Sequence, residues 1–263
     1  MCGIAGYSLD ATSNVDRTLA AQALLAGIAD RGSDAAGYAY LTPGRVSVFK
    51  RRAGASALLE EITVPADASA ALLHVRDFTK GHPSLDANNH PIRHAGLVGI
   101  HNGIIANDDE IFARHGLERA EEGMTVDSES IFALVARYGH DRGRVLEELY
   151  GSMAAAWLDE SAPNALFLAR GIGRPLWIGR GRRAFVFAST RSTLELAQRY
   201  TGLRLRLSEV GEGRLLTVVD GQLERVDAFE PDRSFEKEAP PAVRAPDEHR
   251  RCLVQLNALA ALS

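Results

Sequence analysis

Hydrophobic positions in the first thirty residues follow two different periods. Residues 3–9 form a mostly apolar run with small residues, which predicts a buried strand. From residue 16 to residue 30, leucine and isoleucine recur at helical spacing among alanines. Asn14 or Asp16 can cap the start of this helix, and Gly32 lies just past its end. The pattern therefore predicts a strand followed by a helix.

The next part of the chain predicts strands separated by a hairpin turn and by one long loop. The expected elements are a hairpin of residues 38–41 and 45–50, a short helix near 56–61, and strands at 70–76 and 97–105. Residues 77–93 are rich in Gly, Pro, Asn and His and have no period, which is typical of a functional loop. His101, Asn102 and Gly103 interrupt the last strand and predict either a bulge or a close approach of the backbone to a ligand.

Helices and strands are grouped, rather than alternating, in the second half of the chain. Helices are expected at residues 108–114, 127–138, 141–150 and 191–200, and strands at 153–158, 165–169, 176–178 and 184–188, with further strands up to residue 223. Strict alternation would favour a parallel doubly wound sheet. The grouping instead favours the α+β class.

The composition changes after about residue 226. Residues 229–248 are charged, contain four prolines and lack a hydrophobic period, which is typical of an extended linker or a strap along the surface. Leu253, Leu256 and Leu259 then recur at helical spacing. The sequence therefore predicts one domain over residues 1–226, followed over residues 227–263 by a linker or strap and a C-terminal helix.

Composition and charge exclude several classes of protein. The 263 residues are 46% hydrophobic and carry a net charge of −4 with both signs interspersed, so neither a nucleic-acid partner nor an anionic membrane surface is indicated. Acidic residues break the first thirty positions and no apolar run reaches the length of a membrane span, so a cytoplasmic location is expected. A disulfide between the two cysteines, Cys2 and Cys252, would suit an oxidising compartment that nothing else suggests.

Cys2 is the first candidate for chemistry. If Met1 is removed, which a small second residue favours, the mature chain starts with a thiol and a free α-amine on the same residue. An α-amine has a pKa of about 7.7 to 8 and can take the proton from a nearby thiol, so Cys2 would supply both the nucleophile and the base. The alternative interpretation is a buried strand cysteine that happens to lie early in the chain.

Five separated motifs resemble, in their order, those of the class II glutamine amidotransferases, which are N-terminal nucleophile hydrolases. They are Cys2-Gly3-Ile4; the segment from Arg31 to Gly37; His74-Val75-Arg76 with Thr79 and Gly81; Asn89-His90-Pro91 with the segment from His101 to Ile105; and Asp127-Ser128-Glu129. The motif style is most similar to the glutaminase domains of amino-sugar synthases. The resemblance implies a four-layer αββα sandwich with the nucleophile at the end of a central strand.

The resemblance also implies roles for individual residues. The side-chain amide of Asn102 and the backbone N–H of Gly103 would form the oxyanion hole, and Thr79 and Arg31 would line the substrate pocket. Arg76 suits the α-carboxylate of glutamine because a guanidinium binds it with two hydrogen bonds, and Asp127 suits the α-ammonium. The alternatives are a surface salt bridge for Arg76, a helix N-cap for Asp127 and a charge at a helix C-terminus for Arg31.

The sequence departs from the amino-sugar synthases at two positions of the predicted loop. Those proteins usually have tryptophan and histidine where this chain has Asp77 and Lys80, although Lys80 can still bind a carboxylate as a cation. Five histidines fall within residues 74–101, but Pro91 separates the only pair at helical spacing and no further ligand cluster completes a set. Neither a metal nor a cofactor is therefore expected.

The sequence supports an enzyme that hydrolyses the side-chain amide of L-glutamine through a γ-glutamyl thioester and releases ammonia. About forty residues lie beyond the resemblance, too few for a second catalytic domain, so the ammonia is expected to pass to a separate synthase subunit. Two alternatives stay open. One is a free-standing hydrolase of another γ-glutamyl amide, and the other is a non-catalytic binding or scaffold homologue.

Overall fold

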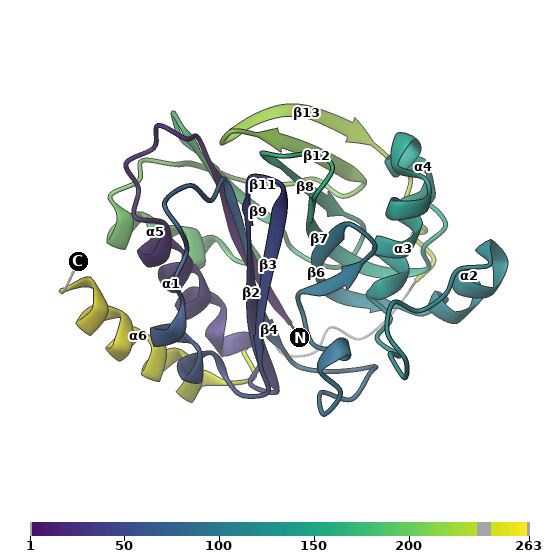
Figure 1. The fold of residues 1–263 in the computed structure, drawn as a ribbon, viewed down its shortest axis with the longest axis horizontal. Helices are drawn as coiled ribbons and strands as arrows, with labels where there is room; N and C mark the ends of the chain where they lie inside the picture. The colour runs from purple at the N-terminus through teal and green to yellow at the C-terminus, as the bar shows by residue number, and fades with distance from the viewer. Residues whose placement is uncertain (1, 236–242, 262–263) are drawn as a thin grey trace.

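Two antiparallel sheets face each other at the centre of the molecule, and helices cover the outer face of each (Figure 1). The structure is a computed structural model that describes residues 2–235 and 243–261. One apolar core lies between the sheets, and a further core lies under each helical layer. This arrangement confirms the predicted α+β class and the four-layer αββα sandwich.

The first sheet has seven strands in the order β11-β9-β10-β1-β4-β2-β3. Its strands are β1 (Gly3–Leu9), β2 (Ala35–Thr42), β3 (Arg45–Arg51), β4 (Ala70–Arg76), β9 (Trp177–Arg180), β10 (Ala184–Ala188) and β11 (Arg206–Glu209). Every residue of β1 and β4 is buried because both faces of these central strands are covered. The short apolar runs in the sequence are therefore strands in the middle of the sandwich.

The second sheet has six strands in the order β13-β12-β8-β7-β6-β5. They are β5 (Ile92–His94), β6 (Leu97–Ile105), β7 (Gly151–Asp159), β8 (Ala165–Arg170), β12 (Arg214–Val219) and β13 (Gln222–Ala228). The pairing of β6 with β7 runs without a break from Leu97 opposite Asp159 to Ile105 opposite Gly151. The bulge considered for residues 101–103 is therefore wrong.

Gly103 accounts for the polar interruption of β6. Its φ is +153°, and a Cβ atom built on it would lie 1.9 Å from the backbone oxygen of Ser152 on β7. The close approach is thus made by the neighbouring strand, and a glycine is needed because any side chain would collide with that backbone.

The helices divide into two groups. The seven-stranded sheet is covered by α1 (Arg17–Ile28), α5 (Arg191–Thr201) and α6 (Pro246–Ala260), and the six-stranded sheet by α2 (Asp108–His115), α3 (Glu129–Arg137) and α4 (Arg142–Leu146) (Figure 1). Asp16 caps α1 by accepting a 2.9 Å hydrogen bond from the backbone N–H of Leu19, as predicted. A short 3-10 turn, Ala29–Arg31, follows α1 and directs Arg31 toward the start of β1.

Some predicted elements are shorter or different in the structure. Two 3-10 turns, Ala55–Ala57 and Leu59–Glu61, replace the short helix near residues 56–61, and α4 covers only part of the helix expected at 141–150. The loop at 77–93 contains a 3-10 turn, Asp86–Asn88, and the beginning of β5. Residues 236–242 of the predicted strap lie outside the described residues.

Helix α6 packs into the layer formed by α1 and α5. Cys252 and Leu256 on α6 are fully buried and belong to the same apolar core as α1 and β1. Glu248 at its start accepts hydrogen bonds from the backbone and the hydroxyl of Ser56. The boundary predicted at residue 226 stays a prediction, and α6 lies against the domain rather than apart from it. None of the helices described has the length and apolar character of a membrane span.

We predict that Leu256→Ala lowers the free energy of unfolding by about 2–5 kcal/mol, because it leaves a cavity in a fully buried position. Chemical denaturation measures this loss. Val254→Ala is the matched control on the same helix, since Val254 is 71% exposed and its truncation should change stability by no more than about 0.5 kcal/mol. Equal effects of the two substitutions would contradict the packing of α6 on the domain.

Candidate active site

Cys2 lies directly before β1 and is half-buried. Its thiol donates to the backbone oxygen of Asp77 over 3.5 Å, and its own carbonyl accepts a 2.9 Å hydrogen bond from Nε of Arg31. Burial raises the pKa of the Cys2 thiol, and the nearby charge of Arg76 acts in the opposite direction. The sulfur therefore rests mainly as a thiol and needs a base before it can attack.

Arg76 ends β4, immediately beyond the pairing of Gly3 with Val75. The antiparallel register thus places Arg76, which is also paired with Ala35 of β2, beside Cys2 at the edge of the β1–β4 pairing. The Arg76 side chain is 2% exposed, so the surface salt bridge considered from the sequence is wrong. Its guanidinium donates to Asn89 Oδ1 over 2.6 Å, to the backbone oxygen of Lys80 over 2.9 Å and to that of Gly81. Arg76 thereby fixes the loop that follows it.

Asp127 lies two residues before α3, and its carboxylate points to the end of β6. Oδ2 of Asp127 accepts a 2.7 Å hydrogen bond from the backbone N–H of Ile105. The N-cap position of α3 belongs to Ser128, which makes no side-chain cap, so the N-cap interpretation of Asp127 is wrong. Burial raises the pKa of Asp127 to about 6, while the hydrogen bond from Ile105 opposes the shift.

Asn102 lies in β6 with a completely buried side chain. Among the described residues, neither Nδ2 nor Oδ1 of this amide has a hydrogen-bond partner. A bond of 3.1 Å between His74 Nε2 and the backbone oxygen of His101 joins β4 to β6 immediately beside Asn102. Because Ile4 pairs with His74, this bond brings the strand of Asn102 close to the strand that Cys2 precedes.

Buried histidines support the polar residues around them. His101 Nδ1 lies 2.8 Å from Ser128 Oγ, next to Asp127, and His74 stacks on His90 with 4.1 Å between ring centres. Burial lowers the pKa of His74 and of His101 to about 3, so both are neutral at physiological pH. Within residues 2–235 and 243–261, no three His, Cys, Asp or Glu side chains are grouped so as to hold a metal ion.

Lys80 and Thr79 belong to the loop that Arg76 holds. The ammonium of Lys80 lies 2.7 Å from the carboxylate of Asp108 and 2.9 Å from that of Asp109. Asp108 and Asp109 thus bind the ammonium group, and the backbone oxygen of Lys80 accepts a hydrogen bond from Arg76. The substrate-binding role of Lys80 stays a prediction. The side chain of Thr79 is exposed on the loop surface.

Arg174 was missed in the sequence analysis. This arginine is 6% exposed, its only described hydrogen bond runs 3.3 Å to the backbone oxygen of Gly173, and its Nε has no partner among the described residues. Burial lowers the pKa of Arg31, Arg76 and Arg174, while the negative charge of a Cys2 thiolate acts in the opposite direction on all three. In the sequence Arg174 lies between Gly173 and Pro175, outside the five motifs.

Comparison with known proteins identifies the domain. The profile of the glutamine amidotransferase domain matches residues 80–196. Glutamine–fructose-6-phosphate aminotransferase (isomerizing) of Helicobacter pylori strain J99 is 32% identical over 74% of the chain, and that of Chlamydia trachomatis is 33% identical over 83%. The chain belongs to the class II glutamine amidotransferases.

A solved structure confirms the fold of this amidotransferase domain. Glutamine phosphoribosylpyrophosphate amidotransferase from Bacillus subtilis superposes with a TM-score of 0.69 at 20% identity, over 88% of this chain and 50% of that one. The chain spans about a third of the length of the two aminotransferases, 33% and 36%. The family is one of enzymes, and the matched segment contains Lys80, Asn102, Gly103 and Asp127.

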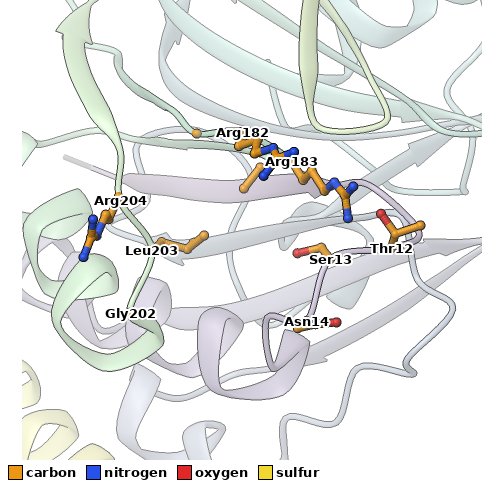
Figure 2. A pocket seen from close by; sticks show the side chains of 10 residues that line it. Thr12, Ser13, Asn14, Arg182, Arg183, Gly202, Leu203 and Arg204 are labelled. Atoms are coloured by element: carbon orange, nitrogen blue, oxygen red, sulfur yellow. The ribbon is translucent and has the colours of Figure 1, made fainter.

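A separate surface hollow lies at the opposite end of β1, about 20 Å along the strand from Cys2 (Figure 2). It has a volume of about 340 Å³ and is lined by Thr12, Ser13 and Asn14 after β1, and by Arg182 and Arg183 between β9 and β10. It shares no residue with the candidate active site of the amidotransferase.

We predict that Asp127→Asn stabilises the protein at pH 7.5 by about 3 kcal/mol. The pKa of Asp127 is about 6 when folded against 3.8 in the unfolded chain, so ionisation favours unfolding as the pH rises from 4 to 6. The substituted amide keeps an acceptor for the N–H of Ile105 without the buried charge. Urea denaturation of both proteins at pH 4 and pH 7.5 tests this, and the difference should vanish at pH 4. A variant that is less stable at both pH values would contradict the raised pKa.

Proposed function

We propose that this amidotransferase domain hydrolyses the side-chain amide of glutamine and releases ammonia, with Cys2 as the nucleophile. The buried amide of Asn102, which has no described partner, carries the proposal. A buried amide without hydrogen-bond partners lowers the free energy of unfolding by about 1–3 kcal/mol. Its presence is explained if it binds the oxyanion of a reaction intermediate. The bond from His74 to His101 supports this because it ties the strand of Asn102 to the Cys2 side of the site.

The mechanism begins with the removal of Met1. The free α-amine of Cys2 then takes the thiol proton, and the sulfur attacks the amide carbon of glutamine. The resulting oxyanion is stabilised by the side-chain amide of Asn102 and the backbone N–H of Gly103. The protonated amine returns its proton to the leaving nitrogen, so the carbon–nitrogen bond breaks and ammonia leaves. Water hydrolyses the γ-glutamyl thioester to glutamate and restores the thiol.

Arg76 and Asp127 recognise the amino-acid end of the substrate in this proposal. Arg76 binds the α-carboxylate while its bonds to Lys80 and Gly81 keep it oriented. Asp127 binds the α-ammonium, and its pKa of about 6 leaves it charged at neutral pH. Arg31 acts by holding the carbonyl of Cys2, and Thr79 contacts the substrate carboxylate from the loop.

The ammonia passes to a synthase in the proposed function. The curated relatives are named as aminotransferases that use fructose 6-phosphate, and they are about three times as long as the matched segment. We propose a separate synthase subunit as the acceptor, which predicts low glutaminase activity alone and a gain when the partner is added. A free-standing hydrolase of another γ-glutamyl amide is the second candidate, because Asp77 and Lys80 differ from the amino-sugar synthases. Turnover of such an amide without a partner distinguishes it.

We predict that Cys2→Ala abolishes glutamine hydrolysis without unfolding the protein. A glutamine-like diazoketone should label Cys2 in the wild type, because Cys252 is fully buried and burial raises its pKa to about 12. Intact-mass analysis should also show a chain without Met1. Peptide mapping identifies the labelled cysteine. Labelling of Cys252 alone, or a fully active protein that retains Met1, would refute the mechanism.

We predict that Asn102→Ala lowers kcat by about 10² to 10³-fold, the usual loss for one oxyanion donor. The substitution should lower the free energy of unfolding by less than the removal of a hydrogen-bonded buried asparagine would, because the side chain of Asn102 forms no described hydrogen bond. Steady-state kinetics and urea denaturation measure the two quantities. A loss of activity that only parallels a loss of stability would assign Asn102 a structural role instead.

A further inference from the structure

Residues 243–245 immediately before α6, here called the pre-helical segment, lie against both chain segments that contact Cys2. The backbone N–H groups of Arg244 and Ala245 donate to the backbone oxygen of Asp30 over 2.7 and 2.8 Å. Nε of Arg244 lies 3.3 Å from Oδ2 of Asp77. The pre-helical segment therefore bridges two segments that are distant in sequence from it and from each other.

Each of these two contacts is connected to Cys2 through one further hydrogen bond. Asp30 precedes Arg31, whose Nε binds the carbonyl of Cys2. The backbone oxygen of Asp77 accepts the hydrogen bond of the Cys2 thiol. A displacement of the pre-helical segment would thus act on two of the described hydrogen bonds that position Cys2.

Asp77 also begins the loop of residues 77–81. On one side, Asp34 holds this loop, because its carboxylate accepts a 2.9 Å hydrogen bond from the backbone N–H of Phe78. On the other side, Arg244 binds the carboxylate of Asp77. Phe78 in this loop is 41% exposed. The first residues of the loop are therefore held by Asp34 and Arg244, while Arg76 and the ion pairs of Lys80 hold its other end.

Helix α6, which follows Arg244, is anchored to the rest of the domain. Beyond the bonds of Glu248 to Ser56, Nδ1 of His249 lies 2.8 Å from the backbone oxygen of Ala26 on α1. Cys252 and Leu256 anchor the remainder of α6 in the core. The backbone that carries Arg244 is therefore held in place, which keeps its guanidinium within reach of the base of the loop.

We propose, on the basis of the proposed glutaminase function, that Arg244 is a positioning residue for the active site. Its ion pair with Asp77 fixes the loop of residues 77–81 in the orientation that binds glutamine and keeps Cys2 aligned. Arg244 and Asp77 are 44% and 24% exposed, so the pair contributes little to global stability. Its effect therefore falls on the geometry of the site rather than on the stability of the fold.

The test compares Arg244→Ala, Arg244→Lys and the control Arg250→Ala in the full chain. Arg250 is on the helix that follows the pre-helical segment and pairs with Asp247 rather than with the site. Arg244→Ala should lower kcat/KM for glutamine by about tenfold, mostly through KM, since small misplacements of a substrate cost up to about 10²-fold. Arg244→Lys should recover most of this loss, and Arg250→Ala should equal the wild type. The melting temperature should be the same for all four proteins.

Salt and alkylation give two further readouts. At about 1 M salt, where the Debye length is about 3 Å, the wild type should approach the kcat/KM of Arg244→Ala, which itself should change less. Iodoacetamide should alkylate Cys2 faster in Arg244→Ala than in the wild type, as measured by peptide mass analysis. This readout does not require glutamine to be the substrate, so it separates failure of this proposal from failure of the proposed function.

Three outcomes would overturn the proposal. The first is an Arg244→Ala protein with unchanged kcat/KM and an unchanged rate of alkylation. The second is an equal loss in Arg250→Ala, and the third is a loss in Arg244→Ala explained by a lower melting temperature. An inactive wild type whose Cys2 is not labelled by the glutamine-like diazoketone, together with faster alkylation in Arg244→Ala, would instead refute only the glutaminase function.

Discussion

The pairing of β1 with β4 is the constraint on which the site depends. β1 is buried on both faces and hydrogen-bonded on both edges, to β4 and to β10, so its start has one position relative to the sandwich. The antiparallel register with β4 then places Arg76 beside Cys2. Cys2 has a defined position because the strand that follows it is in the middle of the sheet.

The site retains polar groups at a cost to stability. Among the described residues, the almost completely buried carboxylate of Asp127 forms no ion pair, and the buried amide of Asn102 has no hydrogen-bond partner. In an ordinary core both would be replaced by apolar residues, because a buried carboxylate without an ion pair and a buried amide without hydrogen bonds both favour unfolding. Their presence is understandable if substrate supplies the missing partners, an ammonium for Asp127 and an oxyanion for Asn102. His101 shows the opposite pattern, since its ring nitrogens contact the hydroxyl of Ser128 and the backbone oxygen of Ser152.

Much of the fold was predictable from sequence because apolar runs and cap residues are local signals. The strands at residues 3–9, 70–76 and 97–105 and the helix capped by Asp16 depend on such signals. Three-residue β5 was not predictable, because so short a strand cannot show alternation. The packing of α6 also escaped prediction, since the bond between His249 and Ala26 joins residues 223 positions apart. In the site, the ion pairs of Lys80 were not predictable, because its acidic partners on α2 come close to it only in three dimensions.

The charges around Cys2 fit a reaction that brings negative charge to the site. Arg31, Arg76 and Arg174 are all buried, and the pKa of each is lowered by that burial, so three cations are kept near the nucleophile at an electrostatic cost. In the proposed mechanism the substrate adds an α-carboxylate, and the attack by Cys2 adds a thiolate and then an oxyanion. An α-ammonium arrives at the same time, and Asp127 is the acid that faces it. The charges of the resting site are therefore complementary to a zwitterion that carries one additional negative charge, the oxyanion. Glutamine has this charge distribution during the attack by Cys2 and not before it.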